Sequence, residues 1–167
     1  MPRRQPSPRQ NSLFKPGPFP VTDGDSLQSR LKHAELLRTL QSASDRPLVQ
    51  IYREEVLPIK TRTIHLLGRK GSARINNTLL GFEVKSSFKR IHCPDLVTAR
   101  YLKLFTEIGC RSIKLPYDPT VTARLVPELE SGVAHLISGT QALFPANRPL
   151  QLYVLRKLYR LIRSQLR

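Results

Sequence analysis

Four arginines near the end of the chain are spaced so that they form one basic stripe. Arg156, Arg160, Arg163 and Arg167 recur at intervals of four, three and four residues, which places them on one side of an α-helix. A guanidinium group can bind a phosphate through two parallel hydrogen bonds, so this stripe is suited to a phosphate backbone. No acidic residue follows Glu130, so no carboxylate near the stripe in sequence neutralises it.

The opposite side of the same predicted helix is apolar, and this leaves three alternatives open. The helix packs on the domain and shows its arginines to water, or the stripe lies along phosphates, or the apolar side inserts at an anionic membrane surface. The apolar side consists of Leu155, Leu158, Tyr159, Ile162 and Leu166.

A second basic segment lies between two glycines. Gly68 and Gly71 allow a tight turn and a close approach to phosphate, and Arg69 and Lys70 between them supply positive charge. The simplest interpretation is the tip of a hairpin, which would still add charge to an exposed edge.

The residues around this loop resemble the core of a KH domain. In that family a GxxG loop joins two short helices, clamps a nucleic-acid backbone and leads into a strand. The resemblance covers about 45 residues and implies a first helix at residues 64–67, the loop at 68–71, a second helix at 72–80 and a strand beginning at 82–84.

A third motif is Glu83-Val84-Lys85, which places a carboxylate and an ammonium group on one face of a predicted strand. Followed by a helix and a strand, it resembles the active-site core of PD-(D/E)xK nucleases. That resemblance implies a divalent metal on Glu83 and a water oriented by Lys85. The upstream acid of the family has no counterpart, because the expected positions hold Asn76 and Asn77. A cross-strand ion pair and an inactive nuclease fold therefore stay open as alternatives.

Further residues are candidates for contacts rather than for catalysis. Lys85, Lys89 and Arg90 form a basic cluster in the middle of the chain. Tyr153 and Tyr159 could stack on bases where they are exposed, and packing is the alternative for both.

The cysteines and histidines indicate no site. Cys93 and Cys110 are too few for a disulfide scaffold or a four-cysteine zinc site, so we expect two buried, reduced thiols. The four histidines show no ligand spacing, and no nucleotide or cofactor fingerprint occurs. We therefore expect no metal and no cofactor.

The overall charge indicates an anionic partner. The chain of 167 residues has 28 Lys and Arg against 12 Asp and Glu, a formal net charge of +16. Residues 51–116 alone hold 13 basic and 5 acidic residues, so the excess is not confined to the ends. Such an imbalance attracts polyanions and releases their counterions, but it does not specify a fold.

The pattern of elements predicts an α+β fold, a small sheet with helices packed on it. Residues 1–24 form a basic, Pro-rich and disordered arm, residues 25–145 the α+β domain, and residues 146–167 a basic amphipathic helix. Within the domain we expect helices at 26–42, 94–108 and 120–143, strands at 48–57 and 112–115, a strand or hairpin at 81–92, and undecided segments at 61–67 and 72–80.

From these observations we expect a non-catalytic protein that binds nucleic acid, RNA in preference to DNA, in the cytoplasm. Targeting to an organelle by the basic arm is a lesser alternative. Two other functions stay open: an adaptor that uses the last helix on a protein partner or an anionic membrane, and a metal-dependent nuclease at Glu83 and Lys85. The sequence does not indicate an oligomeric state.

Overall fold

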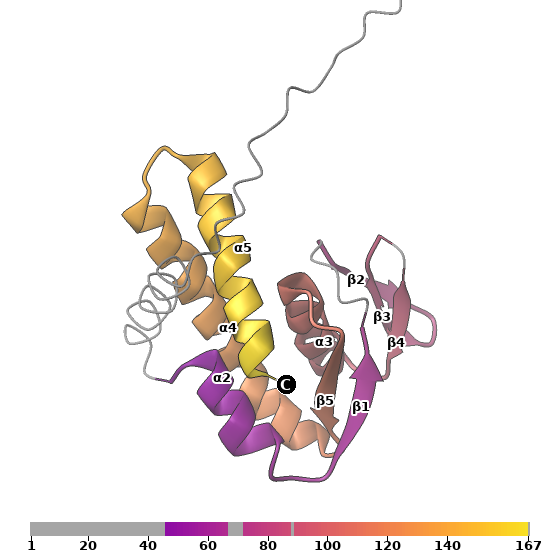
Figure 1. Ribbon diagram of the computed structural model, residues 1–167. Helices are drawn as coiled ribbons and strands as arrows, with labels where there is room; N and C mark the ends of the chain where they lie inside the picture. Colours follow the sequence, from indigo (N-terminus) through magenta and orange to yellow (C-terminus); the bar gives the residue numbers. More distant parts are fainter. Residues whose placement is uncertain (1–45, 67–71, 88, 167) are drawn as a thin grey trace, which may run out of the picture.

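The computed structural model describes residues 46–66, 72–87 and 89–166, and over these residues it has the predicted α+β fold (Figure 1). The Pro-rich arm at residues 1–24 and the helix expected at 26–42 lie outside the described residues. α3 lies between the three-stranded sheet and the pair of helices α4 and α5 (Figure 1).

The sheet is an antiparallel meander of β2 (Arg74–Thr78), β3 (Gly81–Lys85) and β4 (Arg90–Cys93). Gly81 is required at the first turn, because its φ is +117° and a Cβ there would lie 2.9 Å from the carbonyl oxygen of Cys93. The predicted hairpin at 81–92 is confirmed, and the undecided segment at 72–80 is a strand followed by a turn.

α3 (Leu96–Ile108) covers the apolar face of this meander. Asp95 caps its first turn by accepting the backbone N–H of Thr98 at 2.7 Å, so the helix begins just after the predicted Pro94. Gly109 ends it with a φ of 87°, in the left-handed region that favours glycine. The predicted helix and its stop signal are confirmed.

A second, two-stranded sheet joins distant parts of the chain. β1 (Thr61–His65) pairs antiparallel with β5 (Ser112–Pro116), and Ile64 lies opposite Ile113. The Tyr52 hydroxyl accepts the backbone N–H of Lys114 at 2.9 Å, which ties this sheet to the preceding helical segment. The predicted strand at 112–115 is confirmed, and within the undecided segment at 61–67 the residues Thr61–His65 form a strand, while residue 67 lies outside the described residues.

The last two helices form an antiparallel hairpin (Figure 1). α4 (Pro119–Leu143) contains Pro127, and α5 (Arg148–Gln165) begins where Asn147 accepts the backbone N–H of Leu150. Both predicted helices are confirmed. No helix within the described ranges is long and apolar enough to cross a membrane.

The strand expected at residues 48–57 is wrong, because this segment is helical. It consists of α2 (Leu48–Ile51) followed by a π-helix (Tyr52–Val56). The β-branched residues favoured a strand, but burial follows a helical period: Leu48, Ile51, Tyr52 and Val56 are buried while Arg53 is exposed.

Candidate nucleic-acid interface

An open groove with a volume of about 690 Å³ runs along α5. Arg156, Arg160 and Arg163 line it, which brings three members of the predicted stripe to one surface. Over seven residues of helix they span roughly 10 Å. The fourth member, Arg167, lies outside the described residues. The other lining residues are Ser72, Glu107, Leu152, Leu155 and Tyr159.

The groove exists because the apolar side of α5 is packed into the core. Val154, Leu158 and Ile162 are almost fully buried, so this side of α5 is not exposed for insertion into a membrane. Arg163 is held in place, because its Nη1 donates to the carbonyl oxygen of Ile108 at 2.7 Å, at the last residue of α3. The helix thus packs on the domain and presents its arginines at the surface.

The two candidate tyrosines have different environments. Tyr159 is buried, and this burial, together with the nearby charge of Glu107, raises its pKa to about 12. Its hydroxyl therefore stays protonated at neutral pH. Tyr153 is 47% exposed, with the Lys157 ammonium 5.5 Å from its ring centre. Of the two, only Tyr153 offers a ring face for stacking.

All eight carboxylates of the described residues are engaged within the fold. The six glutamates form ion pairs, and the two aspartates cap α3 and α4. Within the groove, the acidic Glu107 is already paired with Lys103 at 3.2 Å, one turn away on α3. Each carboxylate of the described residues therefore already has a partner within the fold.

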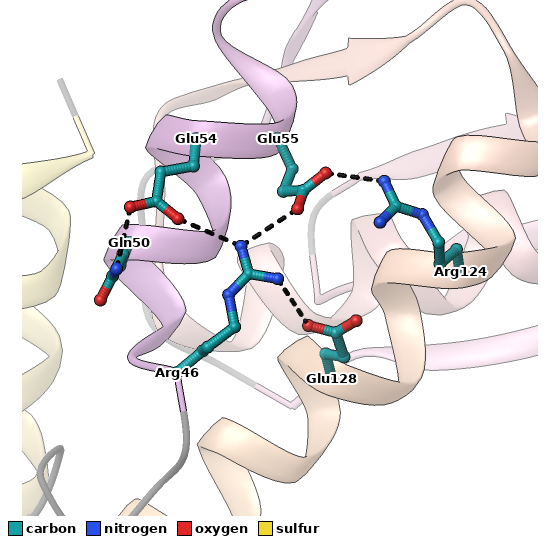
Figure 2. A network of polar contacts seen from close by, with 6 residues as sticks. All are labelled: Arg46, Gln50, Glu54, Glu55, Arg124 and Glu128. Atoms are coloured by element: carbon teal, nitrogen blue, oxygen red, sulfur yellow. Dashed lines mark hydrogen bonds and ion pairs between the residues drawn. The ribbon is translucent and has the colours of Figure 1, made fainter.

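Three of these glutamates belong to one network, which Figure 2 shows from close by. The guanidinium of Arg46 lies 3.1 Å from Glu54, 3.0 Å from Glu55 and 3.5 Å from Glu128. Arg124 of α4 contacts the other oxygen of Glu55 at 2.7 Å. The two guanidinium groups lower the pKa of Glu55. This network fastens the first helical segment to α4 and gathers negative charge there.

A second basic surface lies on the meander. Lys85 of β3 is opposite Arg90 of β4, as the predicted cluster suggests, and also opposite Arg74 of β2. All three side chains are exposed. We call Arg74, Lys85 and Arg90 the cation row. Lys89 is not part of it, because its Nζ donates to the carbonyl oxygen of His65 and links the β3–β4 turn to β1.

Arg74 is a residue that the sequence analysis missed. The signal was present in the alternation of β2, but it becomes visible only when residues 74–78 are assigned as a strand in register with β3.

Glu83 lies on the same face of β3 as Lys85, as predicted. Its side chain is 19% exposed and its Oε2 lies 4.0 Å from Nη1 of Arg90, so the ion pair expected between strands is confirmed. Its register partners are Asn76 and His92. Within the described ranges, no group of three or more His, Cys, Asp or Glu side chains could hold a metal ion.

The helices that the KH resemblance implies on both sides of the GRKG loop are wrong. Ile64 and His65 belong to β1, and Arg74–Thr78 is the strand β2. The β-branched residues of β1 favour extended backbone, and the two asparagines of β2 are poor helix formers. The loop itself, with Arg69 and Lys70, lies outside the described residues.

The two thiols are buried, as predicted. Burial raises the pKa of Cys110 to about 11 and also raises the pKa of Cys93. At neutral pH both are therefore protonated and unreactive.

Comparison of the chain with family models, with curated proteins and with solved structures gives no match. The groove and the cation row are therefore the features that bear on function.

Proposed function

We propose that this protein binds nucleic acid without catalysis, through the groove along α5. The observation that carries the proposal is the alignment of Arg156, Arg160 and Arg163 along one open groove. RNA is the preferred ligand in this proposal, and DNA is the comparison.

The groove combines the two features that a nucleic-acid strand needs. Its arginines can hold phosphates, and each phosphate that is neutralised releases condensed counterions. Leu152 and Leu155, which also line the groove, provide apolar surface for sugars and bases. Most of these contacts involve the backbone, so the proposal includes little sequence preference.

The burial of the apolar side of α5 favours this function over a membrane adaptor. An amphipathic helix binds a bilayer with its apolar side, and Val154, Leu158 and Ile162 are in the core instead.

The test is fluorescence anisotropy with a labelled single-stranded RNA across a KCl series. Three phosphate contacts in the groove contribute about −2 to the slope of log K against log salt for a single strand. The double variant Arg156→Gln/Arg160→Gln should make this slope shallower by about 1.4 and weaken binding at least tenfold.

A matched control removes two charges elsewhere. Lys60 and Arg62 are exposed at the end of β1 remote from His65, so Lys60→Gln/Arg62→Gln lowers the net charge equally without touching the groove. Equal losses in the two double variants would mean that binding reflects net charge alone, and would end the proposal. Tighter binding to anionic vesicles than to RNA would favour the adaptor.

A further inference from the structure

The cation row has an arrangement that the stability of the sheet does not explain. Arg74, Lys85 and Arg90 are directly opposite one another on three adjacent strands, so they project from the same face about 5 Å apart. Like charges directly opposite each other destabilise a sheet. Among the described residues, the one acidic side chain that is ion-paired to the row is Glu83, at 4.0 Å from Arg90.

The row faces away from the core. Side chains alternate along a strand, and the alternate positions of the three strands, Ile75, Val84 and Ile91, pack in the core on the α3 side. The face that carries the row is the open face of the meander. Its next positions are polar as well, since Asn76, Glu83 and His92 lie opposite one another.

The row begins next to a residue that lines the groove. Ser72 lines the groove, and Arg74 follows it by two residues, which is at most about 7 Å of extended chain. Next to Arg74, Lys85 lies on the adjacent strand β3, and Arg90 lies on β4 beyond it. The two basic surfaces are therefore neighbours across the edge strand β2.

The two surfaces also face in different directions. Apart from Ser72, the groove is lined by residues of α5 and by Glu107 of α3, whereas the row points away from α3. A ligand that contacts both must turn around the edge of the sheet at β2. A duplex resists such a turn, because its persistence length is about 150 base pairs, whereas a single strand follows it readily.

We propose that the groove and the cation row form one continuous track for single-stranded nucleic acid, in which Arg74, Lys85 and Arg90 hold the phosphates beyond β2. This inference rests on the proposed function and specifies its ligand. A duplex would contact the groove alone.

The experiment compares two ligands and two variants in the same salt series. The ligands are a labelled 12-nucleotide single-stranded RNA and a 12-base-pair RNA duplex. The row variant is Arg74→Gln/Lys85→Gln/Arg90→Gln, and the groove variant is Arg156→Gln/Arg160→Gln. We expect the row variant to make the single-strand slope shallower by about 2 and to weaken that binding at least tenfold, with duplex affinity changed less than twofold.

Two results would overturn the track, and they differ from failure of the proposed function. Unchanged single-strand binding in the row variant, or an equal loss on both ligands, refutes it while the groove can still stand. If the groove variant also binds RNA as the unmodified protein does, the proposed function fails too.

Lys85→Gln alone keeps the test valid if the triple variant does not fold. The middle cation of the row should then account for a slope change of about 0.7 on the single strand. No slope change in this variant would contradict the track. Lys60→Gln, which removes one exposed charge outside both basic surfaces, is the charge-matched control for Lys85→Gln.

Discussion

Replacing Leu158 with alanine tests whether α5 belongs to the core. Leu158 is 0% exposed, so the variant removes apolar atoms that are fully packed and leaves a cavity. Buried Leu→Ala substitutions cost about 2–5 kcal/mol. The whole free energy of unfolding of a domain of this size is about 5–15 kcal/mol, so the loss should be a large fraction of it.

Leu152→Ala is the matched control, because Leu152 lies on the same helix and is 42% exposed. Both variants exchange leucine for alanine in a helix, so they change helix propensity equally. The control should alter stability by about 0.5 kcal/mol or less, as exposed substitutions do.

The assay is urea unfolding followed by circular dichroism at 222 nm. With a dependence on urea of about 2 kcal/mol per molar, Leu158→Ala should lower the midpoint by about 1–2.5 M. If its midpoint falls no further than that of Leu152→Ala, α5 does not pack on the domain. The groove that depends on this packing would then not exist.

Three further predictions concern single residues. Glu83→Gln removes the partner of Arg90 and should tighten RNA binding about two- to fivefold. The same variant tests the nuclease alternative in an assay with Mg²⁺. If the unmodified protein cleaves nucleic acid and the variant does not, the nuclease alternative is established. Gly109→Ala should lower the free energy of unfolding by about 1 kcal/mol in urea titrations, because its φ is 87°, and an unchanged midpoint would contradict this. Burial raises the pKa of Cys110 from an ordinary value near 9 to about 11. The contribution of this thiol to the free energy of unfolding should therefore be complete below pH 9 and decrease as the pH rises toward 11. Urea midpoints at pH 8 and pH 10.5 in reductant measure this decrease, which should be smaller in Cys110→Ala; an equal decrease would exclude the thiol as its cause.

The helices that were predicted correctly carry clear signals in the sequence. α3 has a signal at each end, Asp95 and Gly109, whereas α5 has regular spacings of leucine and arginine that define its two sides. At residues 48–57 the β-branched residues favoured a strand, but burial of Leu48 and Val56 against distant residues stabilises a helix. Propensity carries no information on such tertiary contacts.

The candidate site could be predicted only in parts. The arginine stripe of α5 is periodic in sequence, so its shared face follows from the sequence alone. Its proximity to Ser72, more than 80 residues earlier, depends on how α5 packs beside α3. Likewise, Arg74 joins Lys85 and Arg90 only through strand register, which short polar strands specify weakly.

The pairing of β1 with β5 has a consequence for how the chain folds. His65 lies opposite Ser112, so this ladder closes a loop of almost fifty residues that contains the whole meander and α3. Closing such a loop costs about 3 kcal/mol of chain entropy, whereas the hairpins of the meander are local and form at little entropic cost. The meander should therefore form early and the ladder late. Substitutions in β1 should then speed unfolding and leave the folding rate nearly unchanged.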